Sequence, residues 1–141
     1  MGIKQYLSQV YILPIEGRIG QIITNNLKDR INTYGIPYNP VYKLSVKIEE
    51  PIIKSQTSLS NKASREALLY KAEYQLFKGD EIVLQDKSSA QTSYSILTKP
   101  YGTVVSKNDA IERAAAIFSD DIALRLSVYF EHLSQKQNND F

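Results

Sequence analysis

The segment that decides the fold is residues 41–49, which read VYKLSVKIE. Tyr42, Leu44, Val46 and Ile48 alternate with polar residues, and this period of two is the spacing of a β-strand. One side of the strand is therefore apolar and the other is polar. Such a strand belongs to a sheet that has one buried face and one face in water. The buried face then needs a second layer to cover it.

Three further strands are predicted around this segment, at residues 5–13, 64–77 and 82–94. The strand at 64–77 again alternates, with Leu68, Tyr70, Ala72, Tyr74 and Leu76 on one side. The sequence Lys78-Gly79-Asp80 predicts a tight hairpin that joins it to the strand at 82–94. The second half of that last strand is mostly polar, which favours an exposed edge position. Residues 52–61 are polar and are expected to form a connection.

Two helices supply the covering layer, one at residues 18–33 and one at 107–134. Their apolar residues recur at helical spacing, and they are Ile19, Ile22, Ile23, Leu27 and Ile31 in the first, and Ile111, Ala114, Ala115, Phe118, Ile122, Leu126, Tyr129 and Leu133 in the second. Pro100-Tyr101-Gly102 is expected to break the chain, with Ser106 capping the second helix. Residues 135–141 are expected to form a polar tail.

The element order β-α-β-β-β-α predicts a two-layer α+β sandwich. Its sheet is four-stranded and mostly antiparallel, and both helices lie on one face. The length of 141 residues favours one domain, here 1–134, followed by the polar tail at 135–141. The longest apolar run, 114–118, is too short for the roughly 20 residues that a membrane-spanning helix needs.

Composition argues against an enzyme. The chain has no cysteine, which excludes disulfides, thiolate metal sites and cysteine catalysis. Its one histidine, His132, is expected near the end of the last helix, where it would interact with the helix dipole. The acidic pairs Glu49-Glu50 and Asp120-Asp121 are neighbours in sequence and so do not face each other. We therefore predict no catalytic residue, no metal site and no cofactor.

Basic residues point instead to an anion-binding site. The net charge of +2 is too small to favour bulk nucleic-acid binding, but a local patch is compatible with it. If the first two strands run parallel through the first helix, the N-termini of both helices converge on one end of the sheet, and helix N-termini favour anions. The cations expected there are Arg18, Lys54, Lys62, Arg65, Lys99 and Lys107. The alternative is a set of solvated surface charges.

Two stretches of the chain carry motifs whose order and spacing are informative. The first comprises Pro14-Ile15, Arg18-Ile19-Gly20-Gln21, Leu27 and Asp29-Arg30. The second comprises Tyr94, Pro100-Tyr101, Thr103-Val104-Val105, Asp109-Ala110, Glu112-Arg113-Ala114 and Asp121-Ile122. In this order and spacing, over about residues 10–130, the chain resembles the LptE family of lipopolysaccharide-assembly lipoproteins.

The resemblance implies a non-enzymatic protein of the outer membrane's periplasmic face. Its partner would be LptD, a β-barrel that it plugs and helps to assemble, and the pair would insert lipopolysaccharide into the outer leaflet. Lipopolysaccharide contact would fall to Lys62, Arg65 and Lys107, with Arg18 and Lys99 also expected at the site. The family is anchored by a lipid on an N-terminal cysteine, which this chain lacks.

Two other functions fit parts of the sequence. Another periplasmic transport-auxiliary lipoprotein would look similar, and only its partner would distinguish it. An RNA-binding α+β module could use the ten tyrosines for base stacking, but the near-neutral charge and the missing glycine-aromatic signature strands disfavour it.

Overall fold

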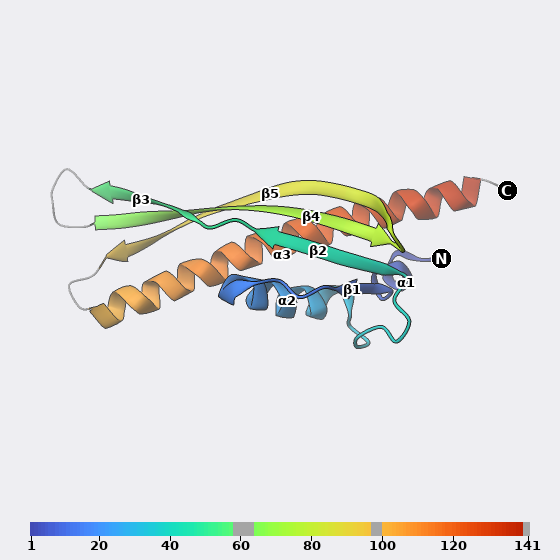
Figure 1. Cartoon of the computed structure of the whole chain (residues 1–141), viewed down its shortest axis with the longest axis horizontal. Helices are drawn as coiled ribbons and strands as arrows, with labels where there is room; N and C mark the ends of the chain where they lie inside the picture. The colour runs from blue at the N-terminus through green and yellow to red at the C-terminus, as the bar shows by residue number, and fades with distance from the viewer. Residues whose placement is uncertain (58–63, 97–99, 140–141) are drawn as a thin grey trace.

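The computed structural model describes residues 1–57, 64–96 and 100–139 (Figure 1). The elements are α1 (Ile3–Leu7), β1 (Val10–Ile12), α2 (Gly17–Ile31), β2 (Tyr42–Ile48), β3 (Ile52–Thr57), β4 (Ser64–Lys78), β5 (Glu81–Ile96) and α3 (Pro100–Asn139). The long β4–β5 hairpin and α3 run side by side along most of the molecule. The mixed α+β class predicted from the sequence is confirmed.

The sheet is organised around β4. β5 pairs antiparallel with β4 along one side, while β2 and β3 pair antiparallel with its two halves along the other side. β2 and β3 therefore lie end to end, interrupted at Glu49, Glu50 and Pro51. β1 runs parallel to β2, as the predicted β-α-β crossover requires. The five strands thus form four rows, with β2 and β3 sharing one row, and the strand missing from the four predicted is β3.

The hairpin between β4 and β5 forms as Lys78-Gly79-Asp80 predicts. Lys78 pairs with Glu81, and Gly79 has a φ of 62°. This left-handed conformation is one that glycine adopts without strain. The turn sets the pairing of Lys78 with Glu81 and of Phe77 with Ile82, and a bulge beside Leu76 then shifts the register by one residue for the rest of the hairpin.

Two predictions about the strands were wrong. The first half of the segment expected as a strand at 5–13 is the short helix α1. Its Tyr6 is buried and stacks on Phe130 of α3, with 5.1 Å between ring centroids. Residues 52–57, expected as a connection, form β3, because the first half of β4 offers backbone groups that a polar segment can satisfy.

Helix α3 is longer at both ends than predicted. It begins at Pro100 rather than after Ser106, since a proline at the first helical position loses no hydrogen bond. It continues to Asn139, so residues 135–139 are helical and not a loose tail. The hydroxyl of Tyr6 donates to Gln137 Oε1 at 2.8 Å, which gives this last stretch a partner. The division into a domain at 1–134 and a tail stays a prediction.

Both long helices pack on the apolar face of the sheet, as expected. The buried stripe of α2 comprises Ile19, Gly20, Ile23, Leu27 and Ile31. The buried stripe of α3 comprises Ala110, Ala114, Ala115, Phe118, Ser119, Ile122, Leu126 and Phe130. The two helices contact each other, and an ion pair between Arg30 and Asp120 joins them on the surface. Within the described residues, no helix has the length and apolarity needed to cross a membrane.

Candidate functional site

The structure brings three of the predicted cations to one end of the molecule. Figure 1 shows that β3 and β5 finish, and β4 and α3 begin, at this end. Lys54 of β3 pairs with Ala67 of β4, two residues from Arg65, so Lys54 and Arg65 are diagonal neighbours on the same face. Lys107 lies in the second turn of α3. We call Lys54, Arg65 and Lys107 the cationic end. Lys62 and Lys99 lie outside the described residues.

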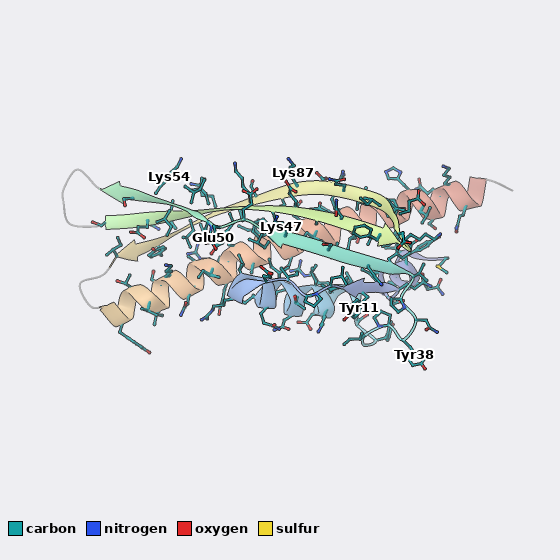
Figure 2. All side chains as sticks on the ribbon, in the orientation of Figure 1. Tyr11, Tyr38, Lys47, Glu50, Lys54 and Lys87 are labelled. Atoms are coloured by element: carbon teal, nitrogen blue, oxygen red, sulfur yellow. The ribbon has the colours of Figure 1, made fainter. Side chains whose placement is uncertain are left out.

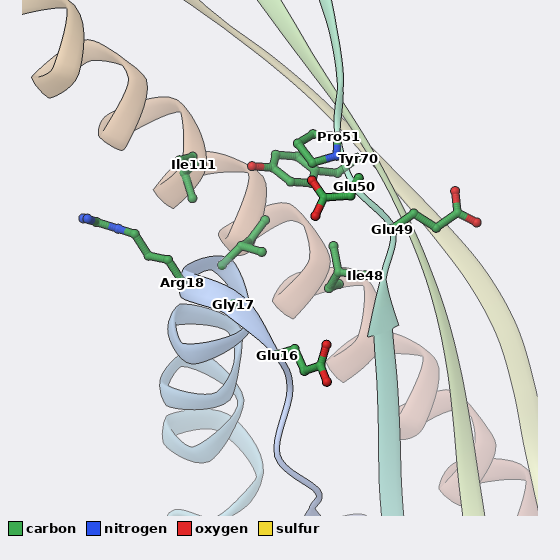
Figure 3. A pocket seen from close by; sticks show the side chains of 10 residues that line it. Glu16, Gly17, Arg18, Ile48, Glu49, Glu50, Pro51, Tyr70 and Ile111 are labelled. Atoms are coloured by element: carbon green, nitrogen blue, oxygen red, sulfur yellow. The ribbon is translucent and has the colours of Figure 1, made fainter.

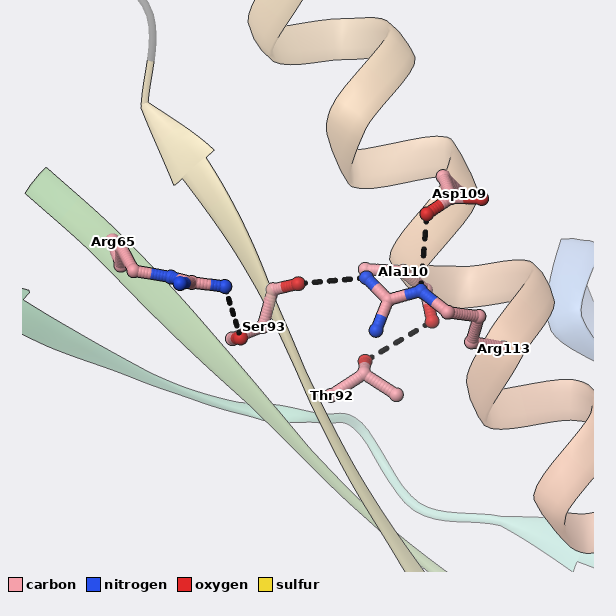
Figure 4. Close-up of polar contacts among 6 residues, drawn as sticks. All are labelled: Arg65, Thr92, Ser93, Asp109, Ala110 and Arg113. Carbon is pink, nitrogen blue, oxygen red and sulfur yellow. Dashed lines mark hydrogen bonds and ion pairs between the residues drawn. The ribbon is translucent and has the colours of Figure 1, made fainter.

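Hydrogen bonds around Ser93 hold this end together (Figure 4). Arg65 Nη2 donates to Ser93 Oγ at 3.0 Å. Arg113 of α3 donates to the backbone oxygen of Ser93 at 2.8 Å and pairs with Asp109 one turn earlier. Because β5 pairs only with β4, its other backbone edge is open, and Arg113 satisfies a carbonyl there. The guanidinium of Arg113 is thus used to attach α3 to the sheet.

A buried contact beside it fixes the position of α3. Thr92 of β5 donates its hydroxyl to the backbone oxygen of Ala110 at 3.0 Å, and both residues are buried. Lys107 lies three residues before Ala110, so this contact places it at the same end of the hairpin as Arg65. Arg65 lies on the sheet face away from the helices, and Lys107 lies in the helix layer.

The acidic residues at this end are already engaged. The hydroxyl of Tyr94 donates to Glu66 on the helix-facing side of the hairpin. Burial, followed by this bond, raises the pKa of Tyr94 to about 12. Among the described residues, no ion pair engages Lys54, Arg65 or Lys107. All three are exposed, so the cationic end presents positive charge that is available to an outside anion.

Arg18 lies elsewhere, and the expected convergence of the two helix N-termini is wrong. Arg18 lines a hollow of about 290 Å³ together with Ile111. Ile111 follows Pro100 by eleven residues, or roughly 16 Å of helix. The reason is that β1 has only three residues and pairs with the beginning of β2, so α2 starts midway along the sheet. The sequence could not place Arg18, because it does not reveal the register of β1 against β2, which puts Ile12 opposite Leu44 and short of the end of β2.

The hollow at the start of α2 does not suit an anion (Figure 3). Its lining includes Glu16, Glu49 and Glu50, against Arg18 as the one basic side chain. Burial, and next the charge of Glu50, raises the pKa of the Tyr70 hydroxyl that faces it. This hollow is therefore separate from the cationic end in both position and charge.

The side chains considered for chemistry are dispersed. His132 is exposed and lies seven residues before the end of α3, too far for the predicted interaction with the helix terminus. In the parts of the chain that the structure describes, no group of three His, Cys, Asp or Glu side chains could hold a metal ion. The side chains of the cationic end offer positive charge and hydrogen-bond donors to a binding partner. The fold that carries these side chains is a two-layer α+β sandwich with exposed cations at one end.

Comparison with known proteins identifies the family. A family model described as LptE, lipopolysaccharide-assembly, matches residues 7–126. The chain therefore belongs to the LptE family. No curated protein matches the sequence significantly.

Solved structures share the fold. A putative lipoprotein from Caulobacter crescentus is 24% identical with a TM-score of 0.78, covering 94% of this chain and 97% of that one. A minor lipoprotein from Acinetobacter baumannii is 17% identical with a TM-score of 0.58, covering 85% and 91%. Rare lipoprotein B from Shewanella oneidensis is 13% identical with a TM-score of 0.50, covering 93% and 100%.

Proposed function

We propose that this protein is a non-enzymatic subunit of the machinery that assembles lipopolysaccharide in the outer membrane. It plugs a β-barrel of the LptD type, helps that barrel to assemble, and contacts lipopolysaccharide. Membership of the LptE family over residues 7–126 is the observation that carries this proposal. The elongated two-layer body supports it, because such a shape can lie along the axis of a barrel.

The cationic end is the proposed contact for lipopolysaccharide. Phosphate groups and lysine or arginine side chains form charge-assisted hydrogen bonds, and arginine can bind phosphate with two parallel bonds. Arg65 keeps part of its guanidinium available, because only Nη2 donates to Ser93. Lys62 and Lys99 remain candidates by their positions in the sequence. Arg18 is the weakest candidate, since the hollow that it lines also holds the carboxylates of Glu16 and Glu50.

The protein would work at the periplasmic face of the outer membrane. Lipoproteins share its fold, which supports this location. Attachment would use an N-terminal lipid carried by a cysteine that this sequence does not include. A partner in the same membrane would then hold the domain in place.

The contact is tested by neutralising Arg65 and Lys107 of the cationic end together with the candidate Lys62. The triple variant Lys62→Gln, Arg65→Gln, Lys107→Gln is expected to weaken lipopolysaccharide binding about tenfold. This is because three exposed charge contacts of roughly 0.5 kcal/mol each add up to a factor of about ten in affinity. Binding is measured by retention on immobilised lipopolysaccharide at 50 and 300 mM salt. The matched control is Lys4→Gln, Lys28→Gln, Lys136→Gln. Equal binding by both triples would remove the lipopolysaccharide contact but leave the barrel partnership untouched.

A further inference from the structure

The sheet face opposite the helices is strongly basic. Strand alternation and register place the following cations on it: Lys43, Lys47, Lys54, Arg65, Lys71 and Lys87. The acids that share this face are Glu49 and Glu73, and Glu73 forms an ion pair with Lys87. We call this surface the open sheet face. Figure 2 shows Lys54 and Lys87 pointing away from α2 and α3.

The charge of the open sheet face differs from that of the rest of the chain. The described residues include 15 of the 17 basic and 14 of the 15 acidic residues, so six cations and two acids on this face leave nine and twelve on the rest of the described chain. The two surfaces therefore have opposite net charge. A solvated sheet face needs only polar residues to stay soluble, and a mixture of both signs would serve. The segregation favours an acidic partner on this side.

The dimensions of the face indicate what kind of partner fits. Lys43 pairs with Phe77, and twelve residues of β4 separate that position from Arg65, which is roughly 41 Å along the strand. Three rows of strands about 4.8 Å apart give an area of roughly 600 Å². This approaches the roughly 800 Å² that each partner contributes to a stable protein interface. The cations are spread over this area, so a single small anion would reach few of them.

Uncharged side chains on the same face also suit a protein surface. Ser89 and Gln91 of β5 offer hydrogen bonds, while Ile52 is half-exposed and Leu69 beside it is partly exposed. A shallow hollow of about 440 Å³ lies between Lys71, Lys87 and the two acids. Basic, polar and apolar groups interspersed over one face are typical of interfaces between proteins.

We propose that the open sheet face docks against an acidic protein wall, and that this wall is the inner surface of the barrel partner. The inference rests on the proposed function and adds the surface that mediates it. The helix layer would then face away from that stretch of the wall. Lys54 and Arg65 belong to both the docked area and the cationic end, whereas Lys107 lies in the helix layer outside the docked area.

Zero-length cross-linking tests the chemistry of the contact directly. The full-length protein is captured with its barrel from membranes, and a carbodiimide is added to join lysine amines to carboxylates in contact with them. Peptide mass spectrometry is expected to find Lys43, Lys47, Lys71 or Lys87 joined to Asp or Glu of the barrel. Cross-links that come instead from Lys4, Lys28 and Lys136 would overturn the inference while leaving the partnership intact. Capture of no barrel by the wild type would contradict the proposed function, and the inference with it.

A variant set provides the second test. Lys47→Gln, Lys71→Gln, Lys87→Gln is expected to reduce barrel recovery about tenfold at 300 mM salt, relative to Lys4→Gln, Lys28→Gln, Lys136→Gln. All these side chains lie on the surface, so both triples should keep the wild-type unfolding midpoint. Undiminished barrel recovery by the first triple would overturn the inference. The inference would also be overturned if the first triple recovered the barrel normally but lost retention on lipopolysaccharide. The open sheet face would then bind phosphorylated saccharide and not the barrel.

Discussion

At the scale of single residues, the close approach of two backbone segments decides which substitutions the protein tolerates. Gly20 lies in the buried stripe of α2, and a Cβ atom built there would lie 2.5 Å from the backbone oxygen of Ile15. No pattern in the sequence predicts this contact, because it depends on how the chain turns from β1 into α2. The alternation of β2, by contrast, could be predicted from its residues alone, and Tyr42, Leu44 and Val46 are all buried.

Replacing Gly20 tests this close approach. Alanine in place of glycine normally stabilises a helix by about 1 kcal/mol. Here Gly20→Ala should destabilise the protein by about 1–3 kcal/mol, because backbone atoms of Ile15 must move. Urea unfolding measures the change. Gly2→Ala is the control, since its Cβ would meet nothing within 4 Å, and a Gly20 variant as stable as this control would contradict the packing.

Two buried tyrosines should respond in opposite ways to loss of the hydroxyl. The Tyr74 hydroxyl is buried and makes no hydrogen bond of normal geometry among the described residues. Burial, followed by the charges of Asp121 and Asp86, raises the pKa of Tyr74 to about 12, against an opposing contribution from the nearby guanidinium of Arg125. Tyr74→Phe should therefore leave stability unchanged or raise it by about 1 kcal/mol, as removal of an unsatisfied group does.

Tyr94→Phe removes the hydrogen bond that the Tyr94 hydroxyl donates to Glu66. This variant should destabilise the protein by about 1.5 kcal/mol, because the Glu66 carboxylate loses its donor. Thermal unfolding of the two variants side by side measures the difference. If Tyr74→Phe proved the more damaging of the two, the hydrogen-bonding assignment would be incorrect.

At the scale of elements, the helices and strands with a clear apolar period could be predicted from the sequence. The strand that forms only through backbone pairing with a neighbour could not. Helix α2, strand β2 and the β4–β5 hairpin have strong apolar patterns or a turn signal, and they appear close to their predicted positions. β3 has no such pattern, and it forms because β4 extends beyond β2 and offers an edge to pair with. The early start of α3 was missed because Pro100 was interpreted as a break.

Asp86 links two elements and gives stability a dependence on pH. The backbone N–H of Lys87, together with Arg125 of α3, lowers the pKa of Asp86 below its ordinary value of 3.8. A lowered pKa in the folded state means that the stabilisation is present above about pH 4. It is lost as the pH falls through the lowered pKa.

Asp86→Asn should therefore be less stable than the wild type at pH 6, with the difference shrinking by pH 3. Urea midpoints at the two values measure it. The matched control is Asp80→Asn in the hairpin turn, which removes a carboxylate that forms no ion pair among the described residues. A deficit for Asp86→Asn that persists unchanged at pH 3 would argue against the link between β5 and α3.

At the scale of the whole molecule, the class of fold was predictable and the distribution of sites was not. Alternating strands and two amphipathic helices require a two-layer sandwich, and the family follows from motifs spread along the chain. The position of Arg18 depends on the register of β1 against β2, which periodicity does not reveal. The basic open sheet face depends on register, which brings together lysines from separate strands.

The central claim is that this protein is the partner of an outer-membrane β-barrel in lipopolysaccharide assembly. The most direct measurement is co-purification of the full-length, C-terminally tagged protein from mild detergent extracts of its own membranes, with the mass of each recovered protein determined. The account predicts an LptD-type barrel in equal amount. Recovery of the protein alone, or with an inner-membrane transporter, would contradict the function while leaving the fold as described.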